Sequence, residues 1–170
     1  MYIVKGVESM KLYAGLTYEQ TVRRYADCVL RACSVHINNA ADAEDCFQNT
    51  FVKLYVKSPD FNDEEHLKAW LLRVAINECN SCARSNSRRR SVAQPPVFAP
   101  SAEDTGDISW ALSLVELKYR QVLYLHYCER YKIDEIALIL GKNKNTVKTM
   151  LSRGRDRLRK IYGGEQNEKA

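Results

Sequence analysis

A chain of 170 residues, of which 45% are hydrophobic, can form one medium domain or two small ones with buried cores. The sequence contains no apolar run long enough to cross a bilayer, and its first residues lack the apolar core and cleavage site of a signal peptide. We therefore expect a cytoplasmic protein without a membrane span. The net charge of +5 is unevenly distributed, because the C-terminal part is the most basic.

Three amphipathic helices are predicted in the first half of the chain. The first begins at Thr17, which has with Gln20 the spacing of a capping box. The second begins near Asn39 and carries acidic residues in its first turns, where the helix dipole favours anions. The third follows an acidic loop and has Asn62 as its expected N-cap.

The third helix has two chemically different faces. Apolar residues at helical spacing predict its buried face, formed by Leu67, Trp70, Leu71, Val74 and Ala75. The opposite side carries a stripe of hydrogen-bond donors, Arg73, Asn77, Asn80 and Arg84. Spacing alone leaves two interpretations of this donor stripe equally open: solvent-facing surface, or a nucleic-acid face, because guanidinium and amide groups fit phosphates and base edges. The Trp70 indole is expected in the core rather than on a base-stacking surface.

The segment 85–107 is expected to be a linker, because it is first basic, then proline-rich, then acidic, and shows no helical or strand periodicity. It separates a helical domain at 16–84 from a second helical domain at 108–162. An N-terminal extension (1–15) and a disordered tail (163–170) flank them. The expected fold class is all-α: two small helical domains joined by a flexible linker, the C-terminal one a helix-turn-helix four-helix domain.

The helix-turn-helix is predicted from a short amphipathic run that ends at Gly141, a residue that tolerates positive φ at a helix end. A strongly cationic helix follows. Between Lys142 and Lys160, eight basic residues stand against Asp156, so this segment carries +7 and the remainder of the chain −2. A cationic second helix after a tight turn is typical of a helix that enters the DNA major groove. A merely solvated face is less favoured, because one sign dominates.

Six cysteines raise a separate hypothesis. Cys79 and Cys82 form a CxxC pair, and Cys28 and Cys33 lie near His36, an arrangement that allows a zinc or redox site. Cysteines at this helical spacing are more often neighbours on a buried stripe. We therefore expect no metal and no cofactor.

Three segments, in order, resemble the regions of bacterial sigma factors. Residues 42–51 (DAEDCFQNTF) resemble the polymerase-binding motif, and 68–77 (KAWLLRVAIN) look like the adjoining promoter-melting helix. Residues 119–123 together with 134–137, 146–148 and 151–155 resemble the C-terminal region. The match covers about 16–162. The lack of an added N-terminal region, and of a helical domain in the linker, points to the extracytoplasmic-function (ECF) class.

The resemblance implies three sets of binding residues. Polymerase contacts are expected at Asp42, Glu44, Asp45, Gln48, Asn49 and Phe51. Contacts to the minus-ten promoter element are expected at Asn62, Lys68, Arg73, Asn77, Asn80 and Arg84. Contacts to the minus-thirty-five element are expected at Lys144, Asn145, Thr146, Lys148, Thr149, Ser152, Arg153 and Arg155. The implied partners are core RNA polymerase, through the clamp helices of its largest subunit and the flap of the second, promoter DNA and a cognate anti-sigma factor.

The sequence carries no catalytic constellation: no glycine-rich phosphate loop, no HExxH and no paired acids. The function that the resemblance implies is that of a non-enzymatic sigma factor, which binds core polymerase and directs promoter recognition and strand opening. Two alternatives remain: a stand-alone helix-turn-helix regulator and, less favoured, a cysteine-based metal or redox sensor.

Overall fold

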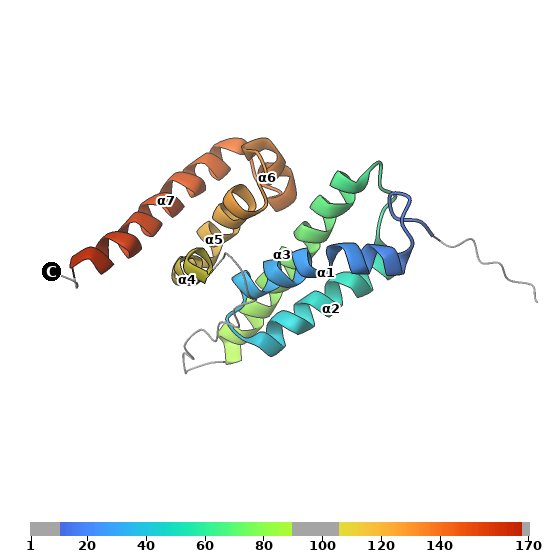
Figure 1. Cartoon of the computed structure of the whole chain (residues 1–170), viewed down its shortest axis with the longest axis horizontal. Coiled ribbons are helices and arrows are strands. Elements are labelled where there is room, and N and C mark those ends of the chain that lie inside the picture. The colour runs from blue at the N-terminus through green and yellow to red at the C-terminus, as the bar shows by residue number, and fades with distance from the viewer. Residues whose placement is uncertain (1–10, 90–105, 168–170) are drawn as a thin grey trace, which may run out of the picture.

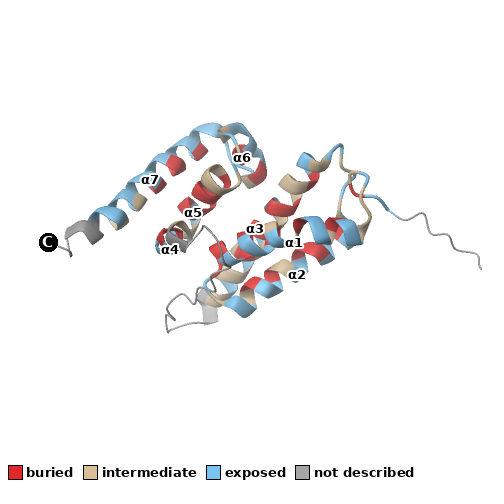
Figure 2. Ribbon diagram, in the orientation of Figure 1, coloured by how far each residue is buried: buried red, intermediate tan, exposed pale blue. Residues whose placement is uncertain are grey.

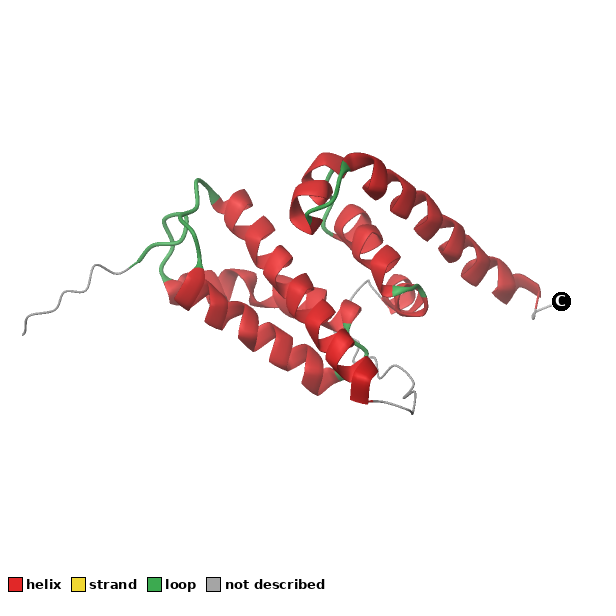
Figure 3. Cartoon of the chain, turned by 180° about the vertical axis from the view of Figure 1, so that it is seen from behind, coloured by secondary structure: helices red, strands yellow, loops and turns green. Residues whose placement is uncertain are grey.

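The computed structural model describes residues 11–89 and 106–167, and these are helical without a β-strand (Figures 1 and 3). The elements in chain order are α1 (Tyr18–His36), α2 (Ala40–Lys57), α3 (Glu64–Arg89), α4 (Gly106–Leu114), α5 (Leu117–Leu123), the π-helical turn η1 (Tyr124–Cys128), α6 (Ile133–Leu140) and α7 (Lys144–Asn167). The all-α prediction is confirmed. Within the described ranges, no helix has the length and apolarity needed to cross a membrane.

Side-chain caps fix where the N-terminal helices begin. The capping box of α1 is present: Gln20 N donates to Thr17 Oγ1 at 3.2 Å, and Thr17 N donates to Gln20 Oε1 at 2.9 Å. Asn39 caps α2 by accepting from Asp42 N at 3.0 Å. The predicted cap of α3 is wrong by one residue, because Asp63 Oδ1, not Asn62, accepts the first-turn N–H of His66 at 2.7 Å.

Two helices extend into segments that were expected to be irregular. Helix α3 continues to Arg89, and Asn86 near its end donates from Nδ2 to Asp42 Oδ2 at 2.8 Å, which ties this turn to the start of α2. Helix α7 continues to Asn167, through the predicted disordered tail. The rest of the predicted linker, 90–105, and residues 168–170 lie outside the described residues.

The helix-turn-helix is formed by α6 and α7. Gly141 ends α6 with φ of 62°, and Lys142 N donates back to Ala137 O at 2.9 Å. Asn143 then caps α7, since its Oδ1 accepts from Thr146 N at 2.7 Å. Figure 1 shows α7 lying along the outer side of α4 and α5, and Figure 2 shows that its buried residues face them.

The buried residues form two clusters, and α3 contributes to both. Leu67, Leu71 and Ala75 of α3 pack against α1 and α2. Leu72 and Ile76, which are 0% and 1% exposed, instead join the core built by α4 to α7. Trp70 and Val74, also expected on the buried face, are only partly buried, and Trp70 packs against the first of these two clusters.

Candidate nucleic-acid interface

The face of α2 predicted to bind polymerase is largely open to solvent. Its exposed polar residues are Glu44, Asp45, Gln48 and Asn49. Asp42 is half-buried and is held by the amide of Asn86. The arrangement offers carboxylates and amides on the outer side of one helix, which suits pairing with a basic surface.

Phe51 requires a correction. Its side chain is 4% exposed and packs edge-to-face on Phe47 with ring centroids 5.1 Å apart, so it supports the helix from the core and does not lie on the polar face. Three apolar residues exposed on α2 were not predicted as part of this face. Val52, Tyr55 and Val56 are 56%, 68% and 64% exposed. Their positions off the buried helical stripe are the signal that could have identified them.

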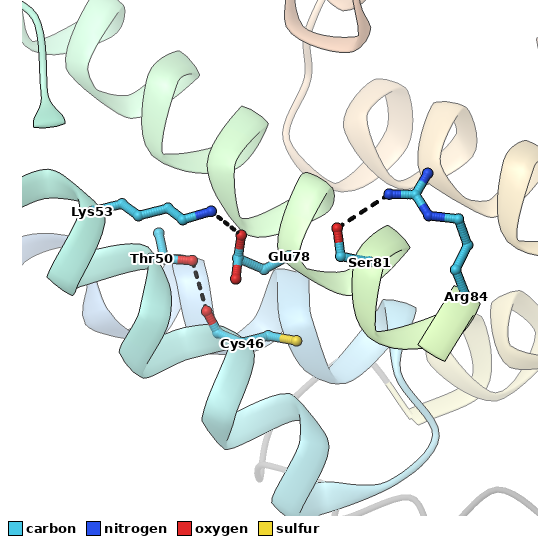
Figure 4. A network of polar contacts seen from close by, with 6 residues as sticks. All are labelled: Cys46, Thr50, Lys53, Glu78, Ser81 and Arg84. Atoms are coloured by element: carbon cyan, nitrogen blue, oxygen red, sulfur yellow. Dashed lines mark hydrogen bonds and ion pairs between the residues drawn. The ribbon is translucent and has the colours of Figure 1, made fainter. Parts of the chain in front are cut away.

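Polar contacts fix α2 against α3 (Figure 4). Lys53 of α2 forms an ion pair with Glu78 of α3. Within α2, Thr50 Oγ1 donates back to Cys46 O at 2.8 Å. Arg84, a predicted minus-ten residue, turns back on its own helix and donates to Ser81 Oγ at 3.1 Å (Figure 4). It remains exposed, as do Asn62 and Asn77.

The other predicted minus-ten residues have partners in the C-terminal helices. Lys68 Nζ lies 2.8 Å from Glu129 Oε2. Arg73 donates from Nε to Ile139 O at 3.1 Å and from Nη2 to Leu138 O. Asn80 Oδ1 accepts from Gln121 Nε2 at 2.5 Å. These C-terminal partners were not predicted, although the adjacent apolar pairs 71–72 and 75–76 signal a helix that is buried on two sides.

A cavity of about 420 Å³ lies between the N-terminal half of α3 and α6. Its lining includes Trp70, Arg73, Tyr131 and Leu138. The Trp70 ring is partly buried and meets Phe61 edge-to-face at 5.7 Å, so it takes part in the core and also borders this cavity.

The N-terminal half of α7 presents the predicted minus-thirty-five residues to solvent. All eight are exposed: Lys144, Asn145, Thr146, Lys148, Thr149, Ser152, Arg153 and Arg155. Asn145, Thr146, Thr149 and Arg153 also line a hollow of about 420 Å³. Donors and hydroxyls around the start of an exposed helix are the groups that read base edges in the major groove.

Two of these cations are held by neighbours. Arg155 donates from Nε to Tyr127 Oη at 2.6 Å, and Lys144 pairs with Asp134 at 2.7 Å. Arg153 has no ion pair with a side chain of the described residues, and it lines the hollow described above. Arg153 is therefore available to contact bases, whereas Lys144 and Arg155 are held along the flank of the helix.

The described cysteines differ in environment, since the hydrogen bond with Cys79 lowers the pKa of Cys46. Burial raises the pKa of Cys82 to about 11 and that of Cys28 to about 12, so both thiols stay protonated near neutral pH. Cys79 is fully buried beside Cys33 and Cys46. Among the described residues, no three His, Cys, Asp or Glu side chains are grouped to hold a metal ion.

Both halves of the chain match known protein families. Residues 21–89 match the family Sigma-70 region 2, and residues 111–158 match Sigma-70, region 4. The ECF RNA polymerase sigma factor SigW of Bacillus subtilis is 27% identical, with 94% of this chain and 96% of that protein covered. The RNA polymerase sigma-E factor of Streptomyces avermitilis is 29% identical over 85% of this chain and 84% of its own.

Solved structures of similar proteins have the same fold. The sigma factor RpoE of Bartonella quintana, crystallised with the anti-sigma factor NepR, superposes with a TM-score of 0.69 and 26% identity, with 86% of this chain and 96% of that chain covered. CnrH, in complex with the cytosolic domain of CnrY, shares the fold at a TM-score of 0.62 and 21% identity, covering 86% of this chain and 88% of its own. The chain belongs to the sigma-70 family of RNA polymerase sigma factors, in its ECF class.

Proposed function

We propose that this protein binds core RNA polymerase in the cytoplasm and directs transcription initiation at specific promoters. The observation that carries the proposal is the presence, on one chain and in order, of the region 2 and region 4 family matches. A stand-alone helix-turn-helix regulator needs only the second. The polymerase supplies the chemistry of RNA synthesis, and this chain supplies promoter recognition and strand opening.

Polymerase binding is assigned to the outer face of α2. Asp45, Gln48 and Asn49 supply charge and hydrogen bonding toward the clamp helices of the largest subunit. The neighbouring exposed Val52 and Tyr55 supply apolar area that would be covered in the complex. The flap of the second large subunit is the proposed partner of the C-terminal domain.

Promoter DNA is assigned to two surfaces. The N-terminal half of α7 is proposed to enter the major groove at the minus-thirty-five element, with Asn145, Thr149 and Arg153 toward base edges. The donor stripe of α3 is proposed to face the minus-ten element, where bases are captured from an unstacked strand. Extrusion costs least where the duplex is weak, and amide donors such as Asn77 can read the exposed edges.

A cognate anti-sigma factor is proposed as a further partner. The supporting observation is that the similar RpoE of Bartonella quintana was crystallised with the anti-sigma factor NepR. Such a partner would regulate the amount of free protein available to polymerase.

Run-off transcription with core polymerase on a promoter library tests the proposal. The wild-type protein should give transcripts from a defined subset of promoters. The double variant Asp45→Ala, Gln48→Ala should lose transcription and co-purification with polymerase, while Glu19→Ala, an exposed carboxylate on α1, should retain both. A double variant that transcribes like wild type would remove the polymerase assignment of α2.

A further inference from the structure

The turn between α5 and α6 carries a side chain that contacts the cationic helix α7. Tyr127 lies in the π-helical turn η1, and its Oη accepts a hydrogen bond from Arg155 Nε at 2.6 Å. The guanidinium carbon of Arg155 also lies 5.8 Å from the centre of the Tyr127 ring, within the range of a cation–π contact. We propose that Tyr127 is a positioning residue, which orients Arg155 toward a backbone phosphate of promoter DNA. The inference rests on the proposed placement of α7 in the major groove.

The irregular backbone after α5 sets the direction of the Tyr127 side chain. In η1 the N–H of Glu129 donates to Tyr124 O at 3.1 Å, which is the five-residue spacing of a π-helix and not the four-residue spacing of an α-helix. Arg130 then takes a φ of 63°, a left-handed conformation that is unfavourable for a residue other than glycine. Single π-helical turns and strained residues occur frequently at functional sites. The contact of Tyr127 with α7 is a function that this turn supports.

Neighbouring groups fix the Tyr127 ring in the protein without DNA. The ring of His126 meets it edge-to-face, with ring centroids 4.8 Å apart. His126 is itself held, because its Nδ1 lies 3.1 Å from Tyr131 O. Tyr127 is therefore a fixed acceptor beside Arg155. An arginine that is already oriented loses less conformational freedom when it binds a ligand, and this increases its contribution to affinity.

Arg155 lies on the flank of α7 and not on the face that is proposed to read bases. Asn145, Thr149 and Arg153 follow each other at intervals of four residues and form one stripe of the helix. At 3.6 residues per turn, Arg155 is rotated by about 120° around the helix axis from Thr149, the centre of this stripe. When a helix inserts into the major groove, side chains on its flanks meet the phosphates that border the groove. This geometry favours phosphate over a base edge as the ligand of Arg155.

The tyrosine oxygen holds Arg155 without neutralising its charge. Other cations of α7 are paired with carboxylates: Lys144 with Asp134, Arg157 with Glu116, and Arg159 with Asp156. A phenol carries no charge at neutral pH, so Arg155 keeps its full positive charge for a ligand. Its Nε is occupied by Tyr127, and the edge formed by Nη1 and Nη2 is a fork that fits two oxygens of one phosphate.

A phosphate contact differs measurably from a base contact. Phosphates carry no sequence information, so losing the contact should weaken binding to every duplex by the same factor. Neutralising a phosphate also releases a counterion, and the logarithm of the affinity therefore falls with the logarithm of the salt concentration, with a slope of about −0.9 per contact. Arg155 should contribute to this slope, and Tyr127 should act only through Arg155.

The test compares the full-length variants Tyr127→Phe, Arg155→Ala and the double variant. Phenylalanine keeps the ring beside the guanidinium and removes only the oxygen that accepts from Arg155. Tyr18→Phe is the matched control, because it removes a phenolic hydroxyl that donates to Phe51 O at 3.2 Å in the N-terminal helices. Urea unfolding of each variant verifies that the proteins are folded under the conditions of the binding assay.

The probes are two fluorescent duplexes measured by anisotropy over a range of salt concentrations: a promoter duplex selected by run-off transcription, and a random-sequence duplex. Tyr127→Phe should bind both about fivefold more weakly than wild type and the control, which is the typical effect of one hydrogen bond. Arg155→Ala should weaken binding at least as much and should make the salt slope shallower by about 0.9. The double variant should bind like Arg155→Ala alone, because without the guanidinium the tyrosine oxygen has nothing to orient.

A Tyr127→Phe protein that binds both duplexes like wild type overturns the inference. So does a loss that adds in full to the loss caused by Arg155→Ala, because the tyrosine would then act through the fold and not through Arg155. A wild-type salt slope in Arg155→Ala overturns the phosphate assignment. Run-off transcription by the wild-type protein with core polymerase separates these outcomes from failure of the proposed function. A protein that transcribes without this coupling is a sigma factor without the positioning contact, and one that does not transcribe contradicts the proposed function itself.

Discussion

Gly154 in α7 gives a stability prediction whose sign depends on packing. A β-carbon added at Gly154 would lie 3.0 Å from Cγ and Cδ1 of Leu123. Leu123 is 0% exposed and belongs to the core of the C-terminal helices, so it has little room to move away. Helix propensity alone predicts the opposite effect, because alanine is favoured over glycine inside a helix.

The two effects can be compared in magnitude. The gain in helix propensity is about 1 kcal/mol, whereas overpacking a well-filled core costs about 1–3 kcal/mol. We therefore expect Gly154→Ala to destabilise the protein by about 1 kcal/mol, which corresponds to a decrease in Tm of about 2–4 °C for a chain of this size. Urea unfolding followed by circular dichroism, together with thermal melting, measures both quantities.

Gly163→Ala is the matched control, since Gly163 lies in the same helix and has nothing within 4 Å of an added β-carbon. It should be neutral or slightly stabilising. Leu123→Val in the Gly154→Ala background should relieve part of the clash, so the double variant should lose less stability than the two single changes add up to. A Gly154→Ala protein as stable as Gly163→Ala would refute the argument that α7 and α5 meet closely at this glycine.

Three further predictions concern single residues. Gly141→Ala should lower the free energy of unfolding by about 1–2 kcal/mol in urea titrations, because a β-carbon is unfavourable at φ of 62° although the surrounding space is open. Burial lowers the pKa of His36 to about 4, so as the pH falls the unfolded chain binds a proton at this histidine before the folded chain does. The contribution of His36 to the free energy of unfolding should be complete above about pH 6.5 and should fall toward pH 4 by up to about 1.4 kcal/mol per pH unit. The variant His36→Phe should flatten this pH dependence. Arg153→Ala should weaken binding to a cognate promoter duplex by about 1–3 kcal/mol in anisotropy titrations, and an equal loss on all sequences would reassign Arg153 to phosphate.

Local signals in the sequence were sufficient for much of the secondary structure. Thr17 with Gln20 marked the start of α1, and Gly141 marked the end of α6, because capping depends on residues within one turn. The one-residue error between Asn62 and Asp63 arises because both residue types are good N-caps. Which of them caps the helix depends on the path of the chain as it enters α3. The continuation of α3 to Arg89 was not predicted, and Asn86 in this part of the helix contacts Asp42, a residue distant in sequence.

The sequence predicts a candidate site well where the exposure of its residues depends on a single helix. The exposure of Lys148, Ser152 and Arg153 follows from the periodicity of α7 alone. The burial of Phe51 was missed because its role was taken from the family resemblance and not from its place on the apolar stripe of α2. The partners of Lys68 and Arg73 lie in the other half of the chain, and periodicity contains no information about them.

The two apolar sides of α3 connect stability with function. Leu72 and Ile76 would lose their cover if the C-terminal helices moved away, and exposing two such side chains costs roughly 3–6 kcal/mol before any polar contact is counted. A separation of this cost would not occur to a large extent in the free protein. It becomes favourable only when α2 and the C-terminal helices gain comparable contacts on a partner that holds them apart. The polymerase contacts proposed for α2 and for the C-terminal domain would provide such a partner, so assembly with polymerase and exposure of α3 to DNA should be one coupled step.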